Sequence, residues 1–315
     1  DLASVLAQIP ASTIENIEVI TNPSAKYDPD GMSGIINIKL KEKGNMGLNG
    51  MVNISAGSAL DKFLPKANGS ASVSYSTKKF GFSASIDGRY DQRGRRSDNM
   101  KLLFGSEPNS LEAWMRSRRD GIEEGYSEGM KLGFDWYINQ KNTLTLSYTG
   151  RGQNTISDHT VINNINLIDS MSYRSLDQIT DGDRSGQFHT FSLNYQKKFN
   201  KPDQELMVDA NWNIGRFNRE SIQKIDYLND MFDTDYAFDK KDVTKANDDR
   251  AVVKINYTHP FSKELRLETG YNLNYSNRHS DYDYYFNGLS EKDTATSYVF
   301  HSTEYIHALY ATVGY

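Results

Sequence analysis

Hydrophobic and polar residues alternate with a period of two along most of this chain, which is the pattern of strands with one apolar face. Between residues 265 and 275 the odd positions carry Leu265, Leu267, Thr269, Tyr271, Leu273 and Tyr275, and the even positions carry Arg266, Glu268, Gly270, Asn272 and Asn274. Similar alternation predicts strands over residues 80–90, 130–138, 144–148, 190–196, 206–214 and 252–258. The chain is therefore expected to be all-β.

Short polar turns join the predicted strands in pairs, at Lys78-Lys79, Asn139–Asn142, Asn200–Asp203 and Ser262–Glu264. Their centres recur about every 61 residues, which gives a rhythm of short turn, long strand, long polar loop and long strand. A membrane-spanning strand needs only about 9–11 residues, so most of each unit is expected in loops and strand extensions outside the membrane. Asp226–Asp242 and Ser280–Phe286 are expected to be acidic, tyrosine-containing loops. They would capture a ligand or, as we favour for any single residue, be solvated loops linked to surface polysaccharide through ions.

Composition favours a barrel over the main alternative, a soluble β-sandwich. The chain has 20 Tyr, 14 Phe and 3 Trp although its mean hydropathy is only -0.68, and the apolar faces of the predicted strands carry Trp, Tyr and Phe towards their ends. Barrels hide their hydrophobicity in alternation, whereas sandwich strands are usually about 5–6 residues long and shorter than those expected here. No apolar run approaches the roughly 18–20 residues of a spanning helix, which excludes a helical membrane protein.

Other classes of function find little support. The net charge is -5 without a basic block, so no nucleic-acid partner is expected, and the absence of cysteine removes disulfides and thiolate metal sites. Asp28-Pro29-Asp30-Gly31 suits a turn better than a calcium loop, because Lys39 stands where an EF-hand requires Glu. We expect no catalytic site, no metal site and no cofactor, and therefore no enzyme. The unfavoured alternative is a hydrolase that would use His189 or His259.

The first 43 residues differ from the rest of the chain. Asp1–Ile9 is expected to form a short helix, Ile14–Thr21 and Ile35–Lys41 two strands, and Asn22–Gly34 a loop rich in Pro, Gly and Asp. Residues 41–44 (KEKG) then form a linker into the predicted barrel.

The segment Ile9–Lys43 resembles the end of the plug domain of TonB-dependent outer-membrane receptors. The matching residues are Ile9-Pro10, Ile14-Glu15, Ile17-Glu18-Val19-Ile20, Pro23, Ala25, Tyr27, Gly34 and Ile36-Asn37-Ile38. The variant TNPSAKYD is most similar to receptor-like barrel proteins of Bacteroidota. One departure is Thr21-Asn22, which replaces the Arg-Gly of the family, so the ionic contact that this Arg makes is not carried over.

The resemblance implies a bacterial outer-membrane receptor that imports a solute with energy from the TonB complex. Residues 1–43 would be the C-terminal end of the plug, and residues 44–315 about ten strands of a 22-strand barrel. The segment that contacts TonB and most of the plug would precede Asp1. The alternative is a structural or interaction barrel, a subunit of a surface complex with a surface lipoprotein as partner. The surrounding lipid is the third expected contact.

Candidate substrate-binding residues follow from the plug loop and from the polar face of the strands. Mixed charge on that face suits contact with a plug as well as contact with a solute. The candidates are Asn22, Tyr27, Asp28, Asp30, Asp87, Arg89, Asp135, Asn211, Lys254, Arg266, Glu268 and Asn272.

Overall fold

The computed structural model describes residues 14–20, 35–40, 46–59, 63–104, 111–167, 173–229, 236–262, 264–286 and 291–314. These residues form strands and their connections, and no helix among them is long and apolar enough to cross a membrane. The two N-terminal strands, β1 (Ile14–Ile20) and β2 (Ile35–Leu40), pair antiparallel in a sheet of their own. The predicted strands at these positions are confirmed. The predicted helix at Asp1–Ile9 and the linker after Lys41 lie outside the described residues.

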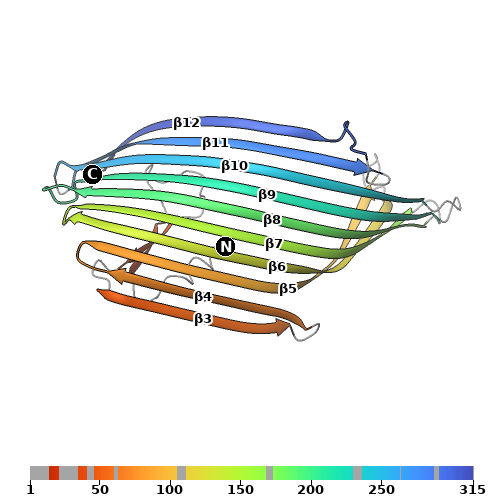
Figure 1. Cartoon of the computed structure of the whole chain (residues 1–315). Coiled ribbons are helices and arrows are strands. Elements are labelled where there is room, and N and C mark those ends of the chain that lie inside the picture. The colour runs from red at the N-terminus through yellow and green to blue at the C-terminus, as the bar shows by residue number, and fades with distance from the viewer. Residues whose placement is uncertain are drawn as a thin grey trace.

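All the other strands form one antiparallel sheet of ten strands, in which each strand pairs with its neighbours in sequence (Figure 1). The strands are β3 (Gly47–Ala59), β4 (Leu64–Ser76), β5 (Phe80–Phe104), β6 (Leu111–Asn139), β7 (Asn142–Leu167), β8 (Tyr173–Lys198), β9 (Glu205–Asn229), β10 (Tyr236–Pro260), β11 (Arg266–Phe286) and β12 (Tyr298–Gly314). The all-β class and the number of about ten strands are confirmed. Within the described residues β3 and β12 pair on one side only, so the sheet is open.

Four short turns lie at one end of the sheet, on the left in Figure 1, where the sequence predicts them. Three of them are closed by a polar side chain that replaces a backbone partner, as turn-forming residues do, and the turn at Asn200–Asp203 is closed by backbone hydrogen bonds such as that from the Gln204 amide to the Lys201 carbonyl at 3.2 Å. The Thr77 hydroxyl accepts a hydrogen bond from the Phe80 amide at 2.9 Å, and the Asn139 side chain accepts one from the Lys141 amide at 2.9 Å. The Ser262 hydroxyl accepts one from the Leu265 amide at 3.0 Å. Local sequence therefore fixes where each hairpin reverses.

The strands run much further from these turns than the alternation predicts. β5 continues from Phe80 to Phe104, whereas the alternation ends at Tyr90. The expected loops at 226–242 and 280–286 are wrong for most of their length: Asp226 lies in β9, Tyr236–Asp242 lies in β10 and Ser280–Phe286 lies in β11. Backbone pairing continues there because a ladder needs hydrogen-bonding partners and not apolar side chains.

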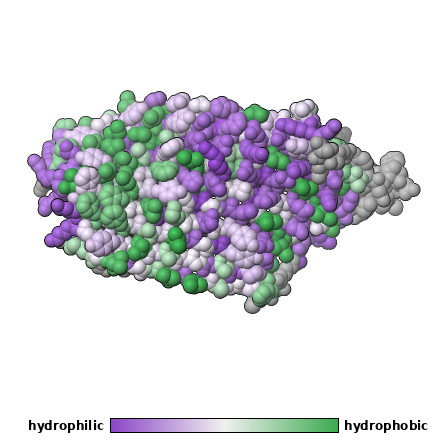
Figure 2. Space-filling view, in the orientation of Figure 1, coloured by the Kyte–Doolittle hydropathy of each residue, from purple (hydrophilic) through white to green (hydrophobic). Residues whose placement is uncertain are grey.

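The register gives the sheet two distinct faces. Leu48, Tyr75, Phe82, Phe134, Leu146, Leu193, Ala210, Val253, Leu273 and His307 are paired in one row across all ten strands. We call the face that carries this row the apolar face and the opposite one the polar face. The half of the sheet from the turns to the row of Ile86, Met130 and Ile214 is the short-turn half, and the remainder is the far half. Figure 2 shows hydrophobic residues gathered toward the short-turn end and hydrophilic ones toward the far end.

Candidate functional site

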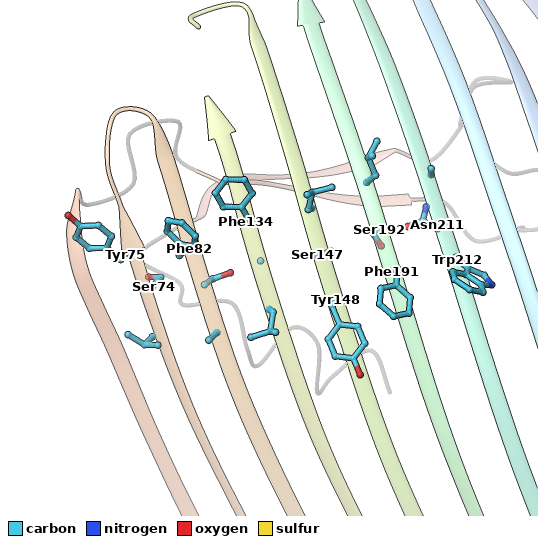
Figure 3. Close-up of a pocket in the computed structure, with 18 of the residues that line it drawn as sticks. Ser74, Tyr75, Phe82, Phe134, Ser147, Tyr148, Phe191, Ser192, Asn211 and Trp212 are labelled. Atoms are coloured by element: carbon cyan, nitrogen blue, oxygen red, sulfur yellow. The ribbon is translucent and has the colours of Figure 1, made fainter. Parts of the chain in front are cut away.

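Aromatic and aliphatic side chains cover the apolar face of the short-turn half. Tyr148 packs against Phe191 with ring centroids 5.0 Å apart, and Phe191 lies 5.8 Å from Trp212 on the next strand. Figure 3 shows these rings projecting from adjacent strands. A shallow hollow of about 930 Å³ lies over them, and apolar side chains make up most of its lining. Trp212 is 51% exposed, and a large exposed apolar surface of this kind is typical of a face that contacts an apolar environment.

A continuous row of polar side chains lies on the opposite face of the same segments. We call it the polar row, and its members are Asp135, Thr145, Asn194, Asp209, Lys254 and Asn272, paired in that order across β6 to β11. The Thr145 hydroxyl donates to the Asp135 carboxylate at 2.6 Å, and the Asn194 amide donates to the Asp209 carboxylate. Lys254 stands opposite Asp209 in the register. Hydrogen bonds and opposite charges thus stabilise a hydrophilic surface directly behind the apolar one.

The eight described candidates predicted from sequence all lie on the polar face, but they do not form one site. Asp135, Lys254 and Asn272 belong to the polar row, and Asn211 lies in the next row toward the far end, opposite Ser192. Asn272 is noteworthy because its side-chain oxygen is buried without a hydrogen-bond partner in the described structure.

The other four candidates lie toward the two ends of the sheet. Arg266 and Glu268 are near the short-turn end, with Nε and Oε1 3.5 Å apart. Asp87 and Arg89 lie toward the far half. Asn22, Tyr27, Asp28 and Asp30 fall outside the described residues.

A charged pocket of about 340 Å³ occupies the polar face of the far half, and sequence reasoning found only one of its residues, Arg89. We call it the arginine pocket, because Arg89, Arg93, Arg95, Arg184 and Arg219 line it. Its carboxylates on the same face are Asp91 and Glu123, while Asp183 and Glu220 belong by register to the opposite face. Five arginines therefore face two carboxylates.

Ion pairs link one side of the pocket into a network. Asp91, only 6% exposed, accepts a hydrogen bond from Arg93 and lies 3.3 Å from the Nε of Arg89. Arg95 donates to Glu123 at 2.8 Å, and the buried His159 lies 3.6 Å from the same carboxylate. Partial burial makes these pairs more stable than exposed ones, since solvent screens them less.

Asp242 is the register partner of Ser221, which lines the arginine pocket together with Arg219. Burial raises the pKa of the Asp242 carboxyl, and the positive charges of Arg219 and Lys240 partly oppose that rise. Burial likewise raises the pKa of Tyr282, which lies on the neighbouring strand. Groups whose pKa is shifted by desolvation are often found at functional sites.

The sequence did contain a signal for the arginine pocket. Asp87, Arg89, Asp91, Arg93 and Arg95 continue the alternation of β5 at every second position. Beyond Tyr90 the pattern is all charge and carries no hydrophobic period, so hydrophobic alternation does not predict a strand there.

Among the described residues, no group of three or more His, Asp or Glu residues is placed to hold a metal ion. His189 and His259 each bond through Nδ1 to a tyrosine hydroxyl, those of Tyr148 and Tyr257, at 2.8 and 3.0 Å. Both histidines lie on the apolar face, and neither is in the arginine pocket or the polar row.

Comparison with known proteins gives the class. Residues 197–315, which include β9 to β12, match the model of the outer membrane protein beta-barrel family. This match, together with the apolar belt on one face of the antiparallel sheet, places the protein in the bacterial outer membrane. The sequence matches no curated protein.

Solved structures show a partial likeness. A mutant of the ferric enterobactin receptor of Pseudomonas aeruginosa, in complex with enterobactin, aligns at 10% identity and a TM-score of 0.34 over 88% of this chain and 57% of that chain. The siderophore receptor PirA of the same organism aligns at 12% identity and a TM-score of 0.24 over 98% of this chain and 80% of that one. The chain thus spans little more than half of the ferric enterobactin receptor. At these scores the likeness carries no functional argument.

Proposed function

We propose that this chain is part of an outer-membrane receptor that imports a solute with energy from the TonB complex. One observation carries the proposal: a polar, hydrogen-bonded face lies directly behind the apolar belt over β6 to β11. Such a face suits the wall of a water-filled lumen and not the packed interior of a small barrel. The resemblance of Ile9–Lys43 to the end of a plug domain supports the coupling to TonB.

The open edges of the sheet support a larger barrel. Leu309 on β12 and Ile54 on β3 are each 84% exposed, and each lies on a strand with one unpaired edge in the described sheet. Unpaired backbone groups in hydrocarbon cost several kcal/mol each, so edges like these require partner strands. We propose that further strands complete the barrel and that residues 1–43 belong to a plug inside it.

Energy-dependent uptake tests the proposal. Cells that produce the full-length protein would be supplied with mixed radiolabelled solutes, with and without a functional TonB. The proposal predicts accumulation of at least one solute that is lost both without TonB and without this protein. Accumulation that persists without TonB would contradict import by this mechanism.

One observation favours the alternative, a barrel subunit that binds a surface lipoprotein. The far end of β5 exposes Met100, Leu102, Leu103 and Phe104, at 63%, 51%, 50% and 58%. These residues lie far from the apolar belt, and exposed apolar clusters often mark contacts between proteins. Crosslinking at Leu102 that captures a lipoprotein in cells, together with an absence of TonB-dependent uptake, would favour this function.

We also propose that the protein is not an enzyme. The histidines considered for a hydrolytic site, His189 and His259, are hydrogen-bonded to tyrosines on the apolar face. Any hydrolysis that disappears in the His189→Ala or His259→Ala variant would contradict this.

A further inference from the structure

Two arginines of the arginine pocket stand directly opposite each other. Arg184 on β8 and Arg219 on β9 are register partners, and both are exposed on the polar face. Side chains directly opposite in an antiparallel pair have Cβ atoms about 4.5–5.5 Å apart, and like charges at that distance destabilise the sheet. Because the pair is present despite this cost, we take the concentrated positive charge as a sign of a function at this position.

Neighbouring carboxylates leave this charge uncompensated. Asp91 pairs with Arg89 and Arg93, and Glu123 pairs with Arg95. Arg184 and Arg219 make no ion pair or hydrogen bond with a carboxylate among the described residues. Arg219 is attracted by Asp242, but the two groups form no direct contact.

The shape of the pocket suits a small anionic group. Thr155, Ser157, Gly182 and Ser221 line it beside the arginine pair, so its walls are narrow side chains and hydroxyls. A Cβ added at Gly182 would lie 2.7 Å from the Ser157 hydroxyl oxygen, so a larger residue there would crowd the space. Guanidinium groups and hydroxyls are the donors that bind carboxylate and phosphate oxygens in proteins.

A second hollow adjoins the arginine pocket on the same face. It has a volume of about 630 Å³ and is lined by Phe188, Phe217, Thr190, Asn213 and Arg250 among others. Phe217 stands in register with Gly186, two residues along β8 from Arg184. An apolar or aromatic body could therefore lie over the phenylalanines while an anionic group reaches the arginines.

We propose that Arg184 and Arg219 form an oxyanion-binding subsite, and that the solute recognised by this face carries carboxylate or phosphate groups. This inference rests on the proposed role as a solute receptor and specifies the class of solute. Arg184 and Arg219 bind the oxyanion directly, and the Thr155 hydroxyl donates a further hydrogen bond, while the Ser157 hydroxyl donates to the Gly182 carbonyl at 3.3 Å. The ion pairs of Arg89, Arg93 and Arg95 hold the pocket wall in place.

Binding of two simple probes tests the subsite. Citrate and pyrophosphate would be titrated calorimetrically, at low salt, into the full-length protein purified in detergent, with maltose as the uncharged control. We expect saturable binding of at least one anion and none of maltose. In the double variant Arg184→Gln with Arg219→Gln, the dissociation constant should rise at least tenfold. The matched control is Arg216→Gln, on the same strand but on the opposite face, where Arg216 bonds to Asp249 at 2.7 Å; it should change binding less than twofold.

Stability of the probe-free variants separates ligand binding from a purely structural role. Removing two opposed positive charges should leave the urea midpoint of the double variant unchanged or raise it. A lower midpoint would show that the arginines pair with carboxylates of the protein itself, and it would overturn the proposal. The proposal would equally fail if the unaltered protein bound neither anion, or if Arg216→Gln weakened binding as much as the double variant.

Anion binding and TonB-dependent uptake, both measured with the full-length protein, distinguish a failure of this inference from a failure of the proposed function. Anion binding that depends on Arg184 and Arg219, without TonB-dependent uptake, would support the subsite and contradict import. TonB-dependent uptake of a solute that the double variant transports normally would support import and contradict the subsite.

Discussion

The two halves of the sheet share one backbone ladder but differ in the chemistry of their side chains. In the short-turn half of β7, Leu146 and Tyr148 lie on the apolar face, while Thr145 and Ser147 lie on the polar face. In the far half of the same strand, the apolar face carries, in order, Asn154, Ile156, Asp158 and Thr160, of which only Ile156 is apolar. The register between β7 and β8 continues from one half to the other without a shift.

The difference shows that the solvent around each half, and not the backbone pairing, determines which side chains that half carries. In the short-turn half one face meets lipid and the other meets water, so the faces must differ. In the far half both faces meet water, and cross-strand ion pairs replace apolar packing. Examples are Arg116–Asp98 at 2.6 Å, Arg216–Asp249 at 2.7 Å and Lys241–Glu220 at 2.7 Å.

The largest effect is expected from a charge introduced at two positions of β7 on the same face. Leu146→Arg puts the charge in the belt and should cost about 2–4 kcal/mol of unfolding free energy in lipid vesicles. Ile156→Arg, in the far half, should change it by no more than about 0.5 kcal/mol, because that position meets water. Urea unfolding in vesicles of defined composition measures both. Equal costs would remove the distinction between the halves.

A tight contact in the short-turn half gives the next effect. Tyr310 crosses over its register partner Gly270 and donates to Asn256 at 2.7 Å, and Asn256 is only 8% exposed. A Cβ at Gly270 would lie 2.6 Å from the Ile255 carbonyl oxygen. Gly270→Ala should therefore displace the ring and cost roughly 1–3 kcal/mol. Gly88→Ala is the control, since its Cβ meets nothing within 4 Å, and it should be nearly neutral in the same unfolding experiment.

The polar row should contribute less than the belt. Thr145→Val removes the hydroxyl that bonds to Asp135 at 2.6 Å, and it should lower the unfolding free energy by about 1 kcal/mol. Thr149→Val, on the same strand and face but exposed, removes a hydroxyl with no described hydrogen bond and serves as the matched control. If both variants lose the same stability, the hydrogen bonds of the row are unimportant.

The smallest effect is expected from the ion pairs of the far half. The hydrogen bond from Arg116 holds the pKa of Asp98 below its ordinary value. A carboxyl with a lowered pKa in the folded state stabilises the fold above its unfolded pKa of about 4, and this contribution disappears as the pH falls through the folded pKa. The stability difference between the unaltered protein and Asp98→Asn should therefore be small at pH 7 and shrink as the pH falls below about 4. A difference that grows on acidification would have the wrong sign.

Much of the short-turn half could be predicted from sequence, because its alternation follows from contact with two solvents. The strand positions, the four turns and the side on which Asp135 and Lys254 lie all came from that period. Most of the far half could not be predicted, because residues on opposite faces there, such as Arg93 and Gly94, are both non-hydrophobic and neither face is marked as apolar. The pairing of Arg184 with Arg219 was nevertheless implicit: both lie equally far along the chain from the predicted turn at Asn200–Asp203. The sequence pattern did not indicate that both strands extend far enough from the turn to bring these two arginines into register.

The site was less predictable than the fold. Arg89 was selected as one member of a polar face, but the pocket combines residues of five strands, β5 to β9, that only the register brings together. The division at residue 43 and the substrate-binding role of all twelve candidate residues stay predictions.

The central claim is that the apolar face of the short-turn half contacts lipid while the polar face contacts water, and fluorescence quenching tests it most directly. The chain contains no cysteine, so single labels can be attached after Leu146→Cys, Ser147→Cys and Ile156→Cys. With the protein in vesicles, quenchers on the lipid chains should quench the label at 146 strongly, and aqueous iodide should quench the labels at 147 and 156. Similar lipid quenching at 146 and 147 would contradict two solvents at one level, and similar lipid quenching at 146 and 156 would contradict the boundary between the two halves.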